Sequence, residues 1–256
     1  MGLIENIKNI ILFNSFCKKK FKQFSKNNTN NLILIEFNSI TDCYLVYSYF
    51  SSELAKKFNA KIIGFTSLKD KTIKNIIKFC LIRLNPLSRL NMYRSFGVDD
   101  FIHYISLDKF LKDKVDRTYH AITKKIKNKK EFENLKINSV LVGDLFYDSY
   151  LKKFLKPTLD FENNEFRKFL YQEIKKFYFW YNLIDKNVKS IVVSHTVYTL
   201  AVPLRICVKK NIEAFQVSLQ HLYRLNKKEY SAYKEFKTFP KLFAKLPKKE
   251  KIEGLK

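Results

Sequence analysis

The feature that most constrains the fold is a set of short apolar runs, rich in β-branched residues, with helical periodicity between them. Three runs are well defined: residues 32–37 (LILIEF), 140–142 within SVLVGD, and 190–194 (SIVVS). Two shorter ones are residues 61–65 and 214–217. Strands that are apolar along their whole length are typical of parallel sheets with helices on both faces. The runs therefore predict a mainly parallel sheet.

Helical patterns occupy the intervals between these runs. Residues 43–58, 72–84 and 199–209 each predict a helix, and Asn59 is a plausible C-cap of the first. The most regular pattern, over residues 163–185, predicts a helix with one buried stripe, with Trp180 beside it in the core. The alternation of strand and helix predicts a Rossmann-like, three-layer α/β domain. Glycine and proline total only 5 + 5 = 10 residues, too few for a turn-dense β-sandwich.

The chain divides into three predicted parts. Residues 1–28 form an amphipathic, basic N-terminal helical segment, residues 29–222 the α/β domain, and residues 223–256 a basic C-terminal tail. The lysine-rich stretch 124–138 is expected to be a solvated connection, and the tail to be loosely packed.

The formal net charge of +25 indicates attraction to a polyanion, which could be nucleic acid, an anionic membrane or a phosphate-bearing substrate. The alternative is genomic drift, because lysine, asparagine, isoleucine and phenylalanine all have AT-rich codons and the lysines are spread along the chain. Aromatic residues among lysines after Tyr223 favour a nucleic-acid-binding module. No helix-turn-helix, RRM or KH pattern accompanies them, so nucleic acid is the less favoured partner.

The four cysteines lie far apart and form no CxxC pair, which predicts buried, reduced thiols in a cytoplasmic protein. The longest apolar stretch, residues 191–208, contains His195, Pro203 and Arg205 and is not expected to span a membrane. The N-terminus lacks the order of charges and the cleavage site of a secretory signal.

Ligands of open parallel sheets bind beyond the carboxyl ends of the strands, so the residues after each run are candidate site residues. These are Asp42 after the first run, Asp144, Tyr147 and Asp148 after the second, and His195 and Tyr198 after the third. Asp144 and Asp148 are four residues apart and would share one helix face. One interpretation is that they bind hydroxyl groups and that one of them is a general base. The alternative is that they only cap the helix. His195 suits acid–base chemistry or a phosphate contact, or is a structural histidine. The alternative for Asp42 is that it only caps the helix that follows. Arg205 is expected to pair with a carboxylate.

The motifs of several enzyme classes are absent from the chain. It has no GxGxxG, Walker, GxSxG, HExxH or CxxC pattern. Dinucleotide oxidoreductases, P-loop ATPases, α/β-hydrolases and zinc enzymes are therefore disfavoured, and neither a metal nor a cofactor is expected.

Two segments, residues 143–160 (GDLFYDSYLKKFLKPTLD) and 190–217 (SIVVSHTVYTLAVPLRICVKKNIEAFQV), resemble bacterial surface-polysaccharide biosynthesis proteins. These are capsule- or lipopolysaccharide-type glycosyltransferases of the GT-B architecture, and the resemblance covers roughly residues 30–225. It implies an acceptor-side Rossmann-like domain, a nucleotide-sugar donor as substrate, and a carbohydrate or lipid-linked acceptor. By this resemblance Asp42, Asp144, Tyr147, Asp148, His195 and Tyr198 line the acceptor cleft. Asp148, His195 and Asp144 are then the candidate bases, with Arg205 among the substrate-binding residues.

A GT-B enzyme has a second Rossmann-like half for the nucleotide sugar, whereas 256 residues supply about one such half. The alternatives left open are a fragment, one part of a split transferase that pairs with a separate subunit, or a stand-alone acceptor-domain homologue. Ile4, Ile7 and Ile11 ahead of Lys18–Lys20 suit docking on the anionic inner face of the plasma membrane. The equal alternative is a helix that packs against the domain.

Overall fold

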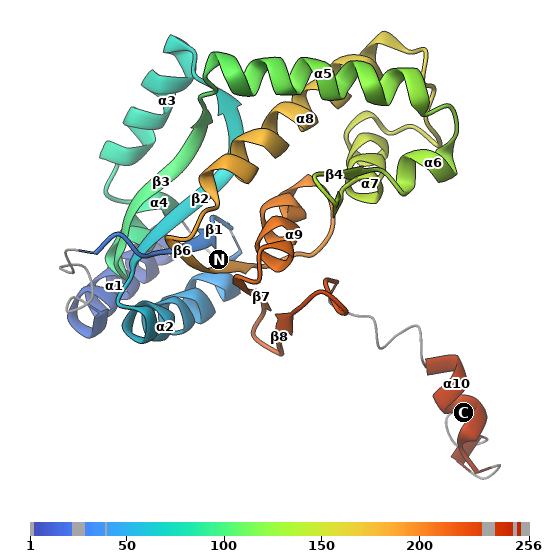
Figure 1. The fold of residues 1–256 in the computed structure, drawn as a ribbon. Coiled ribbons are helices and arrows are strands. Elements are labelled where there is room, and N and C mark those ends of the chain that lie inside the picture. Colours follow the sequence, from blue (N-terminus) through green and yellow to red (C-terminus); the bar gives the residue numbers. More distant parts are fainter. Residues whose placement is uncertain (1–2, 22–28, 39, 232–238, 248–249, 252–256) are drawn as a thin grey trace.

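The computed structural model describes residues 3–21, 29–38, 40–231, 239–247 and 250–251. Its centre is a six-stranded sheet with the strand order β3-β2-β1-β6-β7-β8, in which only β8 is antiparallel to its neighbour (Figure 1). The strands are β1 Leu32–Glu36, β2 Lys61–Asp70, β3 Val98–Ile105, β6 Val188–Val193, β7 Glu213–Val217 and β8 Leu222–Leu225. The predicted α/β fold with a mainly parallel sheet is thus confirmed.

Helices cover both faces of this sheet, which makes three layers. Alternate residues of β1 point to opposite faces, so Ile33 and Ile35 join one core and Leu34 joins the other. The first core is packed by α1 Leu3–Phe21, α2 Thr41–Phe58 and α4 Arg89–Ser95. The second is packed by α8 Asn164–Leu183 and α9 Val202–Lys209. A strand buried on both faces must be apolar throughout, which explains the LILIE sequence.

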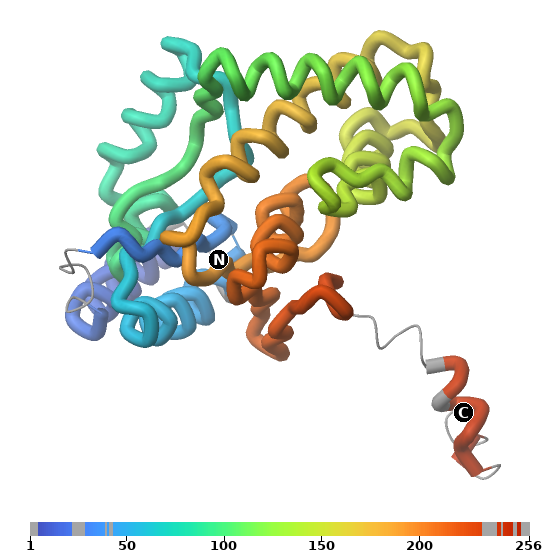
Figure 2. The backbone as a smooth tube through the Cα atoms, viewed as in Figure 1, coloured from blue at the N-terminus to red at the C-terminus, as the bar shows by residue number. Residues whose placement is uncertain are grey.

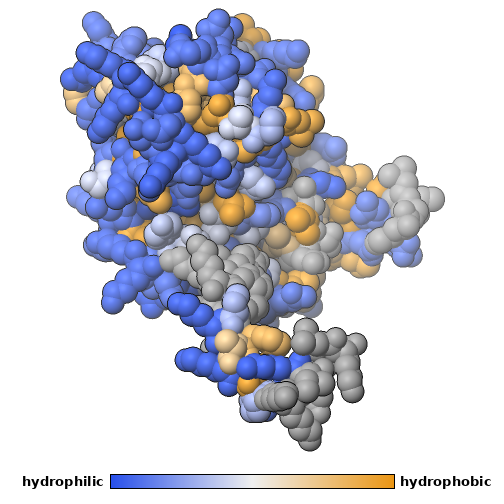
Figure 3. Space-filling model, turned by 90° about the vertical axis from the view of Figure 1, so that its right-hand side faces the viewer, coloured by the Kyte–Doolittle hydropathy of each residue, from blue (hydrophilic) through white to orange (hydrophobic). Residues whose placement is uncertain are grey.

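A mainly helical unit lies between β3 and β6 in the chain and extends to one side of the sheet (Figures 1 and 2). It consists of α5 Lys109–Lys125, α6 Lys129–Glu133, α7 Gly143–Phe154 and the two-stranded sheet of β4 Lys136–Ile137 with β5 Val140–Leu141. Helix α8 packs against both α5 and α7. Hydrophilic side chains cover most of the outer face of the molecule on this side (Figure 3).

The prediction that residues 140–142 form a strand of the main sheet is wrong. Asn138 and Ser139 both have positive φ, at 49° and 63°, which makes a tight turn and pairs β5 antiparallel with β4. The apolar side chains of Val140 and Val142 are buried in the core of the helical unit. A short apolar run is therefore explained by burial, without membership of the sheet.

The stretch 124–138 is not a solvated connection, because it contains α6 and β4 and buries Phe132 completely. The ring of Phe132 lies 5.4 Å from that of Phe166, in the core of the helical unit. Strand β3 was not predicted, since it is an edge strand with exposed Asp100 and lacks a continuous apolar run.

Several local predictions are confirmed. Asn59 adopts the left-handed conformation (φ 45°) at the end of α2, and the helix predicted over residues 72–84 is α3, Ile73–Leu84. Trp180 is buried and packs edge-to-face on Phe65 of β2. The predicted burial of the cysteines is confirmed for Cys17, Cys43 and Cys207, whereas Cys80 is exposed.

The C-terminal segment differs from the expected tail at its start. The first residues of the expected tail, from Tyr223, belong to β8 and pair with β7. Helix α10, Phe239–Lys245, lies apart from the sheet and its helices (Figures 1 and 2). None of the helices in the described part of the chain has the length and apolar content that a bilayer crossing requires.

Candidate functional site

The candidate site lies where the strand order of the sheet reverses direction. Strand β1 is flanked by β2 on one side and β6 on the other, and the chain proceeds outward from each in opposite directions. At such a switch point the loops after the two strands diverge and leave a crevice, which is where ligands of open α/β sheets bind. Glu36 and Asn38 lie at the carboxyl end of β1, and Ser194 and His195 at that of β6.

The Ser194 hydroxyl is the centre of a hydrogen-bond network in this crevice. It donates to Glu36 Oε2 at 2.9 Å, and the Ser194 backbone N–H donates to the same oxygen at 2.7 Å. The Asn38 side-chain amide donates to Ser194 Oγ at 2.8 Å, and Nδ1 of His195 is hydrogen-bonded to Ser194 Oγ as well. Two segments that are distant in sequence, the ends of β1 and β6, thus meet at one hydroxyl.

The hydrogen bonds at this hydroxyl determine the tautomer of His195. A serine hydroxyl donates one hydrogen bond and accepts up to two. When Glu36 is ionised it can only accept, so the Ser194 hydrogen points to Glu36 and Ser194 Oγ accepts from Asn38 and His195. In the neutral imidazole, Nδ1 of His195 then carries the proton and Nε2 holds the free lone pair. The His195 side chain is exposed, so this lone pair is available to a ligand.

Glu36 is buried, and its burial raises the pKa of the carboxyl above the ordinary value of 4.5. Hydrogen bonds from Ser194 and the charge of His195 act in the opposite direction. The Tyr93 hydroxyl accepts from the backbone N–H of Asn38 at 2.9 Å and lies 3.2 Å from the Glu36 carbonyl oxygen. Tyr93 therefore holds the turn that follows β1, and with it the position of Glu36.

Strand β7 completes the network on the far side of β6. The Gln216 side-chain amide donates to the Ser194 carbonyl oxygen at 2.7 Å, and its Oε1 lies 2.9 Å from Nε2 of His221. Sequence reasoning missed Glu36, Ser194, Gln216 and His221. The signal that could have found Glu36 and Gln216 is a buried polar residue at the carboxyl end of an otherwise apolar strand.

The predicted site residue Asp144 makes a bidentate ion pair with Arg205. The two Nη atoms lie 2.6 and 2.7 Å from the two carboxylate oxygens, and Arg205 also donates to the Leu141 carbonyl oxygen at 2.9 Å. Arg205 is only 6% exposed. The expectation that Arg205 pairs with a carboxylate is confirmed, and the pair ties the start of α7 to α9.

Asp148 and Tyr147 lie on the same helix but in different environments. Asp148 is exposed, and desolvation together with the charges of Asp144 and Glu133 raises the pKa of its carboxyl. Tyr147 is buried in the core of the helical unit, with the Lys129 ammonium 4.7 Å from its ring.

Helix α7 contacts the segment after β6, but the two do not share one edge of the main sheet as the sequence predicts, because α7 does not follow a strand of that sheet. The Thr199 backbone N–H donates to Ser149 Oγ at 2.8 Å, and the Lys152 ammonium lies 4.1 Å from the Tyr198 ring. No contact joins either carboxylate of α7 to His195 within the described residues. Asp42 belongs to the first turn of α2, and its side chain lies outside the described part of the structure.

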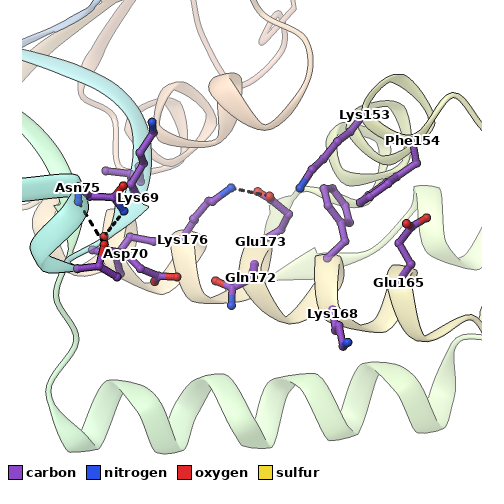
Figure 4. Close-up of a pocket in the computed structure, with 14 residues that line it drawn as sticks. Lys69, Asp70, Asn75, Lys153, Phe154, Glu165, Lys168, Gln172, Glu173 and Lys176 are labelled. Atoms are coloured by element: carbon purple, nitrogen blue, oxygen red, sulfur yellow. Dashed lines mark hydrogen bonds and ion pairs between the residues drawn. The ribbon is translucent and has the colours of Figure 1, made fainter. Parts of the chain in front are cut away.

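A cleft of about 730 Å³ opens between the carboxyl ends of β2 and β3 and the helices α7 and α8. It is lined by charged, polar and apolar side chains: Leu68, Lys69, Asp70, Thr72, Asn75, Ile105, Lys153, Phe154, Glu165, Lys168, Phe169, Gln172, Glu173 and Lys176. In Figure 4, Lys153 from α7 and Lys176 from α8 both extend toward Glu173. A smaller hollow continues from Glu173 and Lys176 to Thr199, in the segment that follows His195.

The charges of this cleft are unevenly paired. Glu173 is 3% exposed; its Oε1 accepts from Lys176 at 2.7 Å, whereas its Oε2 has no hydrogen-bond partner within the described residues. Lys69, Lys153 and Lys168 make no ion pair with an acidic side chain of the described part. The cleft therefore offers positive charge for an anionic group and a buried acceptor oxygen for a hydroxyl.

No known protein-family model, curated protein or solved structure matches this chain. Within the described residues, no group of three or more histidine, cysteine, aspartate or glutamate side chains is arranged to hold a metal ion.

Proposed function

We propose that this chain is a glycosyltransferase-like protein of surface-polysaccharide assembly, of the capsule or lipopolysaccharide type, that contributes the acceptor-side domain. The observation that carries the proposal is the hydrogen-bonded series Glu36–Ser194–His195 at the switch point of the sheet. It orients an exposed imidazole whose neutral form has its lone pair on Nε2, which is what a general base for an acceptor hydroxyl requires.

Sugar transfer at this site would use His195 as follows. The acceptor oxygen attacks the anomeric carbon of the nucleotide sugar while its proton passes to His195 Nε2. The bond between the anomeric carbon and the phosphate oxygen breaks, and the nucleoside diphosphate leaves with the electron pair. The imidazolium that forms is stabilised through Ser194 by the negative charge of Glu36, in the manner of other oriented histidine bases.

The cleft beside α8 supports an acceptor that carries both a phosphate and sugar hydroxyls. Lys69, Lys153 and Lys168 can neutralise phosphate oxygens, and Glu173 Oε2 can accept from a hydroxyl. The half-buried ring of Phe154 adds an apolar surface for a sugar ring.

Association with the anionic inner face of the plasma membrane is part of this proposal. Helix α1 packs against the domain through Cys17 and Phe21, in line with the packing alternative. Its other side exposes Ile11, Leu12 and Phe16, close to the basic last turn of the helix. This side supports a peripheral contact with lipid.

The test is a screen of nucleotide-sugar donors by nucleotide release, with farnesyl-diphosphate-linked N-acetylglucosamine as acceptor. We expect His195→Ala to lower turnover by about a hundredfold or more, the range for loss of a general base. His120→Ala, an exposed histidine on α5, is the matched control and should leave turnover unchanged. Turnover of His195→Ala at the wild-type rate would contradict the role of His195. Absence of release with every donor, together with submicromolar, steeply salt-dependent binding of random DNA, would favour the nucleic-acid alternative.

A further inference from the structure

Helix α3 exposes an apolar stripe along its length. Ile73, Ile77, Leu81 and Leu84 are 79%, 55%, 64% and 78% exposed. At 100° per residue their positions fall within an arc of about 80°, so the four side chains form one continuous row. Water-exposed leucine and isoleucine are ordinary when scattered, whereas a row of this length indicates a surface that binds something apolar.

The opposite face of α3 anchors the helix to the sheet. Phe79 is buried and stacks on His103 of β3, with ring centroids 4.4 Å apart and planes at 16°. The Tyr104 hydroxyl donates to the Asn75 carbonyl oxygen at 2.9 Å. These contacts hold the helix by its opposite face, so the stripe faces solvent in the folded protein and is accessible to a partner.

The segment around the stripe is exclusively basic. From residue 71 to residue 98 the chain has no acidic residue and six basic ones: Lys71, Lys74, Lys78, Arg83, Arg89 and Arg94. Lys74 and Lys78 lie on the same helix directly beside the stripe, at 100° and 140° from Ile73. An aliphatic row with lysines along its margin matches the two layers of an anionic bilayer surface, the acyl boundary and the phosphate groups.

We infer that α3 is an interfacial helix that docks on an anionic lipid surface, with its four aliphatic side chains in the acyl boundary. A protein partner is less well supported, because the stripe contains no tyrosine, tryptophan or arginine, the residues enriched in the cores of protein interfaces. The stripe is also a single convex row along one helix, without the pocket that anchors a protein hot spot.

Docking through α3 would place the lysine-lined cleft at the membrane. Asp70 and Thr72, immediately before α3, and Asn75, in its first turn, all line that cleft. A lipid-linked acceptor would then present its phosphate and sugar where the cleft opens. This step rests on the proposed function, whereas docking of α3 does not.

The experiment is co-sedimentation of the full chain with vesicles of phosphatidylglycerol and phosphatidylethanolamine, and with vesicles of phosphatidylcholine alone. We expect binding to the anionic vesicles and little to the neutral ones. The triple variant Ile77→Ser, Leu81→Ser, Leu84→Ser should bind about tenfold more weakly or worse. The matched control replaces three exposed leucines elsewhere, Leu155→Ser, Leu219→Ser and Leu222→Ser, and should bind as the wild type does.

A second pair of variants tests the charge. The first is the triple variant Lys71→Gln, Lys74→Gln, Lys78→Gln, which should also reduce binding to anionic vesicles by about tenfold or more. The second is the control triple variant Lys127→Gln, Lys130→Gln, Lys136→Gln, which has the same net charge and should bind as the wild type does. All these side chains are exposed, so circular dichroism should show unchanged folding. The inference is overturned if the α3 variants bind like wild type, or if neutral vesicles bind equally well. It is also overturned if only replacement of Ile11, Leu12 and Phe16 on α1 abolishes binding.

Failure of docking and failure of sugar transfer can be told apart. The short-chain farnesyl acceptor needs no membrane, so the α3 variants should leave nucleotide release unchanged. Conversely, His195→Ala should bind vesicles as wild type does, since His195 lies at the carboxyl end of β6 and not on α3.

Discussion

A serine hydroxyl with all of its hydrogen-bonding capacity used determines which ring nitrogen of the neighbouring histidine carries the proton when the imidazole is neutral. Ser194 can donate only once, and when Glu36 is ionised it takes that hydrogen bond, so Nδ1 of His195 is the donor to Ser194 Oγ. The same hydroxyl would leave the tautomer open if Glu36 were protonated. At the scale of single residues, the tautomer of His195, the candidate base, thus depends on the buried carboxyl of Glu36, which need not contact a ligand itself.

Replacing Glu36 with glutamine should change how the free energy of unfolding depends on pH. Burial raises the pKa of Glu36, so the folded state favours the protonated carboxyl. This contribution is fully present below the unfolded-state value near 4.5 and is lost as pH rises through the folded-state pKa. Glutamine stays neutral, so the stability of Glu36→Gln relative to wild type should increase from about pH 4 to about pH 7.

Urea denaturation at several pH values measures this difference, with Glu5→Gln on an exposed position of α1 as control. A stability difference that does not change with pH would contradict the raised pKa of Glu36.

At the scale of elements, the Arg205–Asp144 pair joins helix α7 of the helical unit to α9 beside the sheet. The start of α7 is closely packed as well. A Cβ atom on Gly143 would lie 1.7 Å from the Phe132 carbonyl oxygen, so only glycine fits where the helix begins. The motif GDLFYD therefore owes its glycine and its first aspartate to packing between elements.

Asp144→Asn and Asp148→Asn should differ in stability although they lie four residues apart on one helix. Asp144→Asn leaves a buried guanidinium without its counter-charge, and we expect a loss of about 1–3 kcal/mol, reduced from the buried-pair range because Asp144 is 37% exposed. Asp148→Asn should lower the free energy of unfolding only slightly, since Asp148 is exposed and the pKa of its carboxyl is already raised. Chemical denaturation of both variants checks this ranking. Equal losses would mean that the ion pair does not hold α7 and α9 together.

At the scale of the whole molecule, the cleft combines residues of the sheet with residues of the helical unit. We expect glucose 1-phosphate to bind there, because it carries both a phosphate and hydroxyls. The double variant Lys153→Ala, Lys168→Ala should raise its Kd by about tenfold, as expected for the loss of two charge-assisted contacts. Lys152→Ala, Lys156→Ala has the same net charge with both changes outside the cleft lining, and it should bind normally in calorimetry. Equal weakening by both double variants would indicate a general effect of charge.

The sequence predicts the parallel strands because each is buried on both faces and must be apolar. The prediction fails where a buried run is not part of the sheet or a strand of the sheet is not buried on both faces. Strand β5 is apolar but belongs to the helical unit, and β3 belongs to the sheet but lies at its edge. His195 could be predicted from its place after a strand. Glu36 and Ser194, its partners, are 158 residues apart, and only tertiary structure brings them together.

Helix α8 reaches from one part of the molecule into the other. Toward its end Trp180 packs on Phe65 of β2, and near its start Phe166 packs on Phe132, while Glu173 between them faces the cleft. Because one continuous helix is fixed at both ends, the two walls of the cleft are held at a set separation. A ligand would accordingly enter a preformed space, and selectivity for its size would come from the length and packing of this helix instead of from hinged closure around the ligand.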